Sequence, residues 1–190
     1  MTITWDGTGA NPQKFGGPWT EVSVASDQAA VFIDGGALLG TLRVGTHPIT
    51  AQTAPFLGTL SPAAELYMVR TSPLSARFGS ASAVPFQTPA LSGKLRHFGE
   101  WRYQVSDPER FAQAAIGADP LDAAGKLIAG LFDACALEWM AGGFMTPLDL
   151  AANHEKFQQV LPAHMQTAVE AFGLTVLGLE NFQADIEPVD

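Results

Sequence analysis

The chain has 190 residues, of which 47% are apolar and 15% charged, so it can bury a folded core and differs from a disordered segment. Its formal net charge of −9, from 19 acidic and 10 basic residues, repels polyanions and argues against nucleic acid as a partner. The single cysteine, Cys135, excludes an intramolecular disulfide framework and a zinc site built from several cysteines.

Residues 1–18 predict an N-terminal loop segment with neither the basic region nor the apolar run of a secretory signal. GTGANP, at Gly7–Pro12, contains the first two glycines of a dinucleotide-binding motif. Pro12 stands where the third glycine belongs, and we expect no strand before the motif. A frayed loop is therefore predicted. The most apolar windows of the chain contain Asp34 and Glu138 and fall short of the ~20 residues that span a bilayer, so no integral membrane protein is expected.

From Trp19 to about Val105 the chain predicts short strands, because stretches rich in β-branched and apolar residues alternate with glycine and proline. The predicted strands are TEVSV, AAVFI, ALLGTLRV, ELYMVR, a stretch around RFGSASAVPFQT, and EWRYQV. Asp34, Gly35 and Gly36 separate the second and third of these. Glycine tolerates the positive φ of a tight turn, so these two strands are predicted to form an antiparallel hairpin.

The stretch HFGEWRYQVSDPERFAQAA, residues 97–115, changes from a strand pattern to a helix pattern. Apolar Trp101 and Tyr103 alternate with polar residues, which is typical of a half-buried strand. Asp107 predicts a helix N-cap and Pro108 the first helical position. Three basic residues lie in or beside this strand: Arg96, His97 and Arg102. We expect them to be solvated rather than to form a patch that binds nucleic acid.

From Asp107 to Phe172 the pattern is helical, and three dipeptides divide it into segments: Asp119-Pro120, Thr146-Pro147 and Leu161-Pro162. In the segment Leu121–Ala141 the charged residues before Cys135 fall on one narrow stripe at ~100° per residue, so we expect this helix to be largely buried. These charged residues are Asp122, Lys126 and Asp133. Cys135 lies on the apolar side, where we expect an inert core thiol that resists thiol reagents until the protein unfolds.

After Gly173, a predicted helix C′ residue, LTVLGLENFQADIEP returns to a strand pattern. The residues at positions 176, 178, 180, 182, 184 and 186 are expected to share one face, with Leu177, Leu179 and Asn181 on the other. A β-rich first half, a strand, several helices and a returning C-terminal strand predict an α+β fold, with the last strand beside EWRYQV.

Sequence templates for catalysis and metal binding each lack a required residue. HEKFQ, at His154–Gln158, resembles the start of a zinc-protease helix, but Gln158 replaces the second ligand histidine. We expect His154 in the first turn of a helix opened by Asn153. In GSASA, Ala81 stands where a hydrolase elbow needs its serine. A zinc site assembled from distant histidines stays an alternative, and its candidates are His47, His97, His154 and His164.

Three glutamates lie beside or within apolar sequence, and each would have a raised pKa if buried: Glu65, Glu100 and Glu138. We expect these side chains to be solvated or salt-bridged rather than to form an acid/base pair. The sequence therefore predicts no catalytic, cofactor-binding or metal-binding residue.

Three stretches carry a resemblance and cover most of residues 20–188: VSVASDQAAVFIDGGALLGTLRVGTHPITAQTAPFL, FGEWRYQVSDPERF and FGLTVLGLENFQADIEP. They are similar to the SPFH or band 7 domains of stomatins, prohibitins and flotillins, and most of all to the bacterial branch of virion-core-protein-like SPFH proteins. The resemblance implies an α+β scaffold without a catalytic centre that builds oligomers, often at membranes, and organises other proteins. It also implies a β-rich first subdomain over 19–96 and an α+β second subdomain over 97–188.

The resulting hypothesis is a non-catalytic scaffold or protein-interaction domain, cytoplasmic and compatible with peripheral contact at the inner face of a membrane, with no cofactor. Protein partners and other copies of the chain are the expected partners. No apolar anchor precedes Trp19 and no coiled coil follows Pro188, so we expect a monomer or a weak homo-oligomer. The alternative is a small-molecule-binding domain or minor hydrolase that uses Glu and His residues in a cleft.

Overall fold

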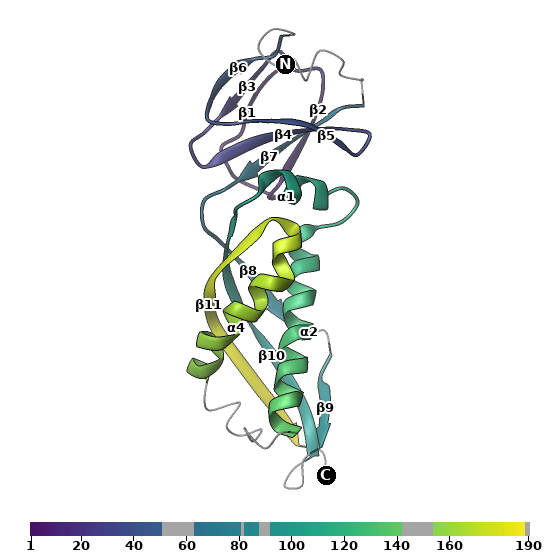
Figure 1. The fold of residues 1–190 in the computed structure, drawn as a ribbon, viewed down its shortest axis with the longest axis vertical. Helices are drawn as coiled ribbons and strands as arrows, with labels where there is room; N and C mark the ends of the chain where they lie inside the picture. The colour runs from purple at the N-terminus through teal and green to yellow at the C-terminus, as the bar shows by residue number, and fades with distance from the viewer. Residues whose placement is uncertain (51–62, 81, 88–91, 142–153, 189–190) are drawn as a thin grey trace. The chain divides into compact units, whose positions relative to one another are not determined.

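The computed structural model describes residues 1–50, 63–80, 82–87, 92–141 and 154–188, and it has the α+β architecture that the sequence predicts (Figure 1). The chain forms two compact units: unit 1 is Met1–Ser72 with Val105–Pro120, and unit 2 is Pro73–Gln104 with Leu121–Asp190. Each unit therefore draws on both sides of residue 96. The sequence subdivision into 1–18, 19–96 and 97–188 stays a prediction.

Unit 1 contains two β-sheets that share one core. The first has the order β1-β3-β6, with β1 (Thr2–Thr4), β3 (Glu21–Val24) and β6 (Gly45–Pro48). The second has the order β2-β7-β4-β5, with β2 (Gln13–Gly16), β7 (Glu65–Arg70), β4 (Gln28–Asp34) and β5 (Ala37–Leu42). Side chains from both sheets lie in the core, where the Trp19 ring meets the Phe32 ring edge-on at 5.5 Å between centroids.

The hairpin predicted from Asp34, Gly35 and Gly36 is confirmed. Strands β4 and β5 pair antiparallel, with Asp34 opposite Ala37 at the turn. Gly35 and Gly36 have φ values of 56° and 85°, a region that side chains with a Cβ rarely adopt. The turn therefore favours glycine at both positions and disfavours β-branched residues there.

The N-terminal residues are more ordered than predicted. Strand β1 precedes the Gly7–Pro12 loop and pairs parallel with β3, so the expectation that no strand precedes this loop is wrong. Trp5, directly after β1, is buried and its Nε1–H donates to the Thr8 carbonyl oxygen at 2.7 Å. Apolar burial of Trp5 thus holds the start of the loop against the core instead of leaving it frayed.

The helix α1 (Pro108–Ala114) begins as its sequence predicts. The Asp107 carboxylate accepts a hydrogen bond from the Arg110 backbone N–H at 3.1 Å, and Pro108 occupies the first turn. The helix packs against β4, β5 and β7 of unit 1. The Thr41 hydroxyl on β5 donates to the Glu109 carboxylate at 2.7 Å, which joins the helix to the sheet.

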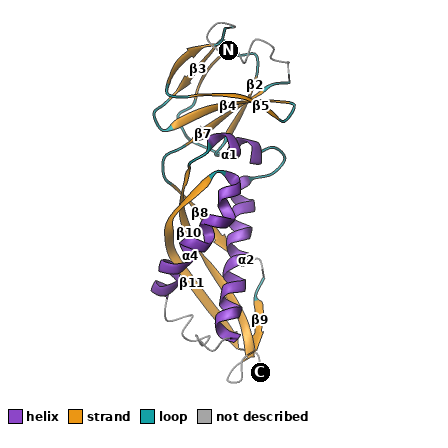
Figure 2. Ribbon diagram, in the orientation of Figure 1, coloured by secondary structure: helices purple, strands orange, loops and turns teal. Residues whose placement is uncertain are grey.

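Unit 2 is a sheet covered on one face by helices (Figures 1 and 2). The sheet has the order β11-β10-β8, and β9 also pairs with β10. Its strands are β8 (Leu74–Gly79), β9 (Val84–Gln87), β10 (Ser92–Val105) and β11 (Leu174–Pro188). The C-terminal strand therefore returns beside the EWRYQV strand, as predicted. Odd-numbered residues of β10 from Gly93 to Val105 are buried, whereas the even-numbered ones face outward.

The helices of unit 2 are α2 (Pro120–Ala141) and α4 (His154–Val169), followed by the short 3-10 helix η2 (Glu170–Phe172). The predicted break at Leu161-Pro162 is wrong, because α4 continues through Pro162. Leu161, Met165 and Val169 are fully buried at four-residue spacing, and α4 packs against β11. This apolar burial outweighs the hydrogen bond that proline cannot make. The expected break at Thr146-Pro147 and the cap at Asn153 lie outside the described residues.

Helix α2 is less buried than predicted. Ala124, Ile128 and Phe132 are buried, but Leu127 and Leu137 are 47% and 38% exposed. The three charged residues predicted to form one stripe also lie in two different environments. Lys126 pairs with Asp122 at 2.6 Å in solvent, whereas Asp133 is only 26% exposed and lies beside a buried histidine.

Strand β11 changes its facing pattern at Asn181, which has a φ of 50°. Leu179 is buried before this residue, and Phe182 and Ala184 are buried after it. The prediction that one face carries positions 176 to 186 in strict alternation is therefore wrong, because the irregular residue shifts the period by one. At the start of the strand, the Gln166 side chain donates to the Leu174 carbonyl at 3.1 Å and accepts from the Val176 N–H at 2.8 Å.

Candidate functional site

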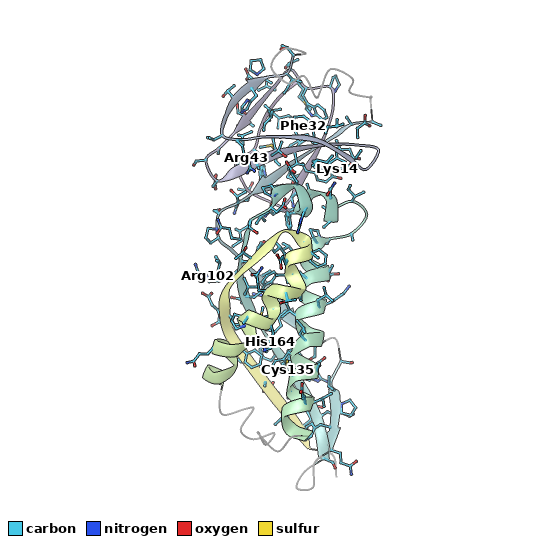
Figure 3. All side chains as sticks on the ribbon, in the orientation of Figure 1. Lys14, Phe32, Arg43, Arg102, Cys135 and His164 are labelled. Carbon is cyan, nitrogen blue, oxygen red and sulfur yellow. The ribbon has the colours of Figure 1, made fainter. Side chains whose placement is uncertain are left out.

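The histidines do not gather into one site. His47 is half-buried, with its Nε2 2.7 Å from the Arg43 carbonyl oxygen, and His164 is exposed on α4 (Figure 3). His97 is buried in β10, and the His154 side chain lies outside the described part of the chain. Among the described residues, no group of three or more His, Cys, Asp or Glu side chains is placed to hold a metal ion.

The polar cluster most like a catalytic site surrounds His97. This side chain is fully buried, and its Nδ1 lies 2.6 Å from the Ser80 Oγ and 3.2 Å from the Asp133 Oδ1. Ser80 follows β8, His97 comes from β10 and Asp133 from α2, so three elements of unit 2 meet here. The Ser80 Oγ also accepts the backbone N–H of His97 at 3.2 Å.

The arrangement of this cluster excludes a Ser-His-Asp relay. A relay needs the serine at one ring nitrogen and the carboxylate at the other, so that the imidazole passes a proton between them. Here the serine and the aspartate both approach Nδ1, while Nε2 is buried and has no hydrogen-bond partner. The Ser80 hydroxyl therefore cannot be activated in the usual way.

The surroundings of His97 are aromatic. Its ring lies 4.1 Å from the Phe132 centroid, 6.0 Å from Phe78 and 6.5 Å from Phe182. Burial lowers the pKa of His97 to about 4, and burial raises the pKa of the Asp133 carboxyl. His97 is thus a neutral part of the unit 2 core at pH 7. The expectation of a solvated His97 is wrong, because it shares the buried face of β10 with Trp101 and Tyr103.

The three glutamates are salt-bridged or exposed. Glu65 binds Lys14 and accepts a hydrogen bond from the Tyr67 hydroxyl at 2.7 Å, and these partners lower the pKa of Glu65. Glu100 lies 3.4 Å from the Arg77 Nε and accepts from the Asn181 amide at 3.2 Å. Glu138 is exposed on α2. The expectation of solvated or salt-bridged glutamates is confirmed for these side chains.

Cys135 is half-buried on α2 (Figure 3). The prediction that the core encloses it is therefore wrong. Partial burial and the nearby Glu138 carboxylate raise the pKa of the thiol. Both effects disfavour the thiolate, which is the reactive form. The predicted inert character therefore rests on charge and partial burial rather than on full enclosure.

The solvent-facing side of the unit 2 sheet is the most distinctive surface of the described residues. We call it the outer face, and its members from β8, β10 and β11 include Ser75, Arg77, Lys94, Arg96, Phe98, Glu100, Arg102, Glu180, Asn181, Gln183, Asp185 and Glu187. Three ion pairs cross it between neighbouring strands: Arg77–Glu100 at 3.4 Å, Arg96–Glu187 at 3.4 Å and Arg102–Glu180 at 3.6 Å. Four of the ten basic residues of the chain lie here.

Phe98 is an apolar side chain in the middle of this charged surface, and it is 45% exposed. Its pairing partner on β8 is Gly79, so no side chain stands beside the ring on that strand. A hollow of about 350 Å³ adjoins the ring, lined by Arg77, Phe78, Phe98, Gly99, Glu100, Asn181 and Gln183. An exposed aromatic ring beside a hollow is typical of protein contact surfaces.

Comparison with known proteins identifies the family but no individual relative. The sequence model of the SPFH domain-Band 7 family matches residues 11–186. No curated protein matches the chain. None of the helices in the described part of the chain is long and apolar enough to cross a bilayer.

Proposed function

We propose that this chain, which belongs to the SPFH domain-Band 7 family, is a non-enzymatic scaffold domain that acts through protein contacts on its surface. The observation that carries the proposal is the outer face of unit 2, where exposed Phe98 stands among paired charges beside a hollow. Surfaces of this composition, with an aromatic centre and a polar rim, suit protein recognition.

The polar chemistry of the chain supports a scaffold over an enzyme. A catalyst needs titratable groups that meet in an accessible pocket with perturbed pKa values. The strongest perturbation belongs to His97, which is fully buried on one face of β10, whereas the hollow beside Phe98 lies on the opposite face. The alternative of a small-molecule-binding domain or hydrolase with Glu and His in a cleft is therefore less well supported.

We further propose that the protein acts in the cytoplasm, alone or as a weak homo-oligomer with protein partners, and that any membrane contact is peripheral. The net charge of −9 disfavours close contact with anionic lipid headgroups, so such contact would be mediated by a partner. The virion-core-protein-like SPFH branch stays our proposal for its place in the family.

Light scattering after size exclusion tests the self-association in this proposal. We expect a molar mass that rises with protein concentration in the micromolar range, and rises further at moderate salt because salt screens the repulsion between copies. A monomer at every concentration and salt would contradict self-association. Turnover of a small ester or phosphate substrate that is lost in a Glu100→Gln variant would instead favour the hydrolase alternative.

A further inference from the structure

The charges beside Phe98 on β10 form a pattern that can recognise a copy of itself. Arg96 and Glu100 stand two residues before and two residues after Phe98, on the same outer face of the strand. Along a strand this spacing places each charge about 7 Å from the aromatic residue. From Arg96 to Glu100 the outward side chains are therefore positive, aromatic and negative, and their order is reversed when the strand is followed backwards.

We propose that the outer face of unit 2 binds a second copy of this chain face to face, about a two-fold axis at Phe98. This inference rests on the proposed function and names the surface through which the scaffold self-associates. A two-fold contact brings the same patch of both copies together, so the patch must complement itself. With the axis perpendicular to β10, the two β10 strands run antiparallel and residues equally distant from Phe98 face each other.

This geometry pairs opposite charges next to the axis. Arg96 of each copy faces Glu100 of the other, so the interface contains two equivalent ion pairs around stacked Phe98 side chains. Within one copy, Arg96 is bound to Glu187 and Glu100 to Arg77, but these pairs are between 32% and 89% exposed. Exposed pairs of this kind are weak, so the side chains can exchange partners at low cost.

Four residues from Phe98 in either direction, the facing charges of the two copies have the same sign. Lys94 and Arg102 stand four residues before and four residues after Phe98, and both are basic and exposed. Across the same axis they face each other as like charges. The twist of the two sheets separates residues at this distance from the axis, which reduces the repulsion without removing it.

The size of the face predicts a weak contact. From Lys94 to Arg102 the three strands cover an area of about 27 Å by about 14 Å, or roughly 400 Å² in projection for each copy. Stable interfaces bury about 1,000 Å² or more in total, whereas two faces of this size bury roughly 800 Å², so the contact is expected to be weak and transient. The apolar contribution comes from the two Phe98 rings, each of which lines the hollow described above on its own copy.

Charge exchange between two variants tests this arrangement. Arg96→Glu and Glu100→Arg should each weaken self-association at least tenfold, because each places like charges opposite one another on both sides of the axis. An equal mixture of the two variants should associate as a heterodimer, since every facing pair is then of opposite sign. The double variant R96E/E100R should again self-associate, and Phe98→Ala should weaken the contact. Sedimentation equilibrium measures all of these.

Arg102→Glu is the matched control, because it makes the same charge change on the same strand and face. It removes the like-charge contact with Lys94 of the other copy, so association should stay equal or become tighter. Circular dichroism melts verify that each variant is folded. Equal weakening by R96E and R102E, or no association in the mixed variants, would overturn the two-fold arrangement while self-association of the wild type still stands. A monomeric wild type would refute both this inference and the self-association in the proposed function.

Discussion

Acidification should destabilise the fold through the buried imidazole of His97. Well above pH 6.5, at about pH 8, the ring is neutral in both the folded and the unfolded chain. As the pH falls, the unfolded ring takes up a proton, whereas burial lowers the pKa of His97 in the folded chain to about 4. The unfolded state then binds more protons, so the free energy of unfolding decreases between pH 6.5 and pH 4.

The magnitude follows from the two pKa values. Between about pH 8 and about pH 5.5 the loss from His97 is about 1.4 kcal/mol, and it approaches about 3 kcal/mol when the pH falls below 4. Asp133 acts in the opposite direction, because burial raises the pKa of its carboxyl and protonation then favours the folded state at low pH. The His97 effect is therefore isolated best between pH 8 and pH 5.5.

Urea unfolding followed by circular dichroism at several pH values measures this loss. The control is His97→Gln, whose amide does not titrate. Its stability at pH 8 need not equal that of the wild type, because only the change of stability with pH is compared. We expect the wild type to lose about 1.4 kcal/mol more than the variant over this window. Equal losses in the two proteins, or an NMR titration of His97 with a pKa near 6.5, would refute the reasoning.

Gly35→Val or Gly36→Val should each lower the free energy of unfolding by about 1–2 kcal/mol, because both positions have positive φ. An unchanged thermal melt in both variants would contradict the turn. Gly130→Ala should raise the free energy of unfolding by up to about 1 kcal/mol, since the residue is exposed within α2 and nothing lies within 4 Å of an added Cβ. A lower melting temperature would count against this. Asp107→Ala should cost about 1 kcal/mol by removing the α1 cap, and an unaltered urea midpoint would show the cap to be dispensable. Cys135 should react with a thiol reagent more slowly in the folded than in the urea-unfolded chain, and equal rates would oppose this.

Local sequence signals predicted the parts of the fold that local physics determines. The hairpin at Gly35 and Gly36 follows from the backbone freedom of glycine, and the start of α1 follows from the Asp107 cap and Pro108. The strand character of β10 follows from alternation around Trp101 and Tyr103. Each of these features depends on residues close together in the chain, so a single sequence contains the information.

The position of His97 was predictable in principle but was missed. The alternation that places Trp101 and Tyr103 on the buried face also includes His97, four residues earlier. The neighbouring Arg96 and Arg102 suggest a solvated basic group. Both are even-numbered, however, and so lie on the face of the strand opposite to His97. Its contact with Asp133 could not be predicted, because it joins a strand to a helix 36 residues later in the chain through tertiary packing.

Two irregularities show where local propensity gave the wrong answer. Proline favours a helix break, but Leu161 cannot cap a helix as Asp107 does, and the buried face of α4 extends past Pro162. In β11, strict alternation fails at Asn181, whose positive φ shifts the facing of every residue after it. Both outcomes depend on what the element packs against, which no window of the sequence contains.

The two faces of β10 have separate consequences for how proteins with this fold can diversify. Substitutions at odd-numbered positions of the strand change the packing around His97 and Trp101, and so they change whether the chain folds at all. Substitutions at even-numbered positions leave that packing intact. After a gene duplication, two descendant proteins can therefore change which partners they bind through the outward side chains alone. Each of them keeps the same folded core.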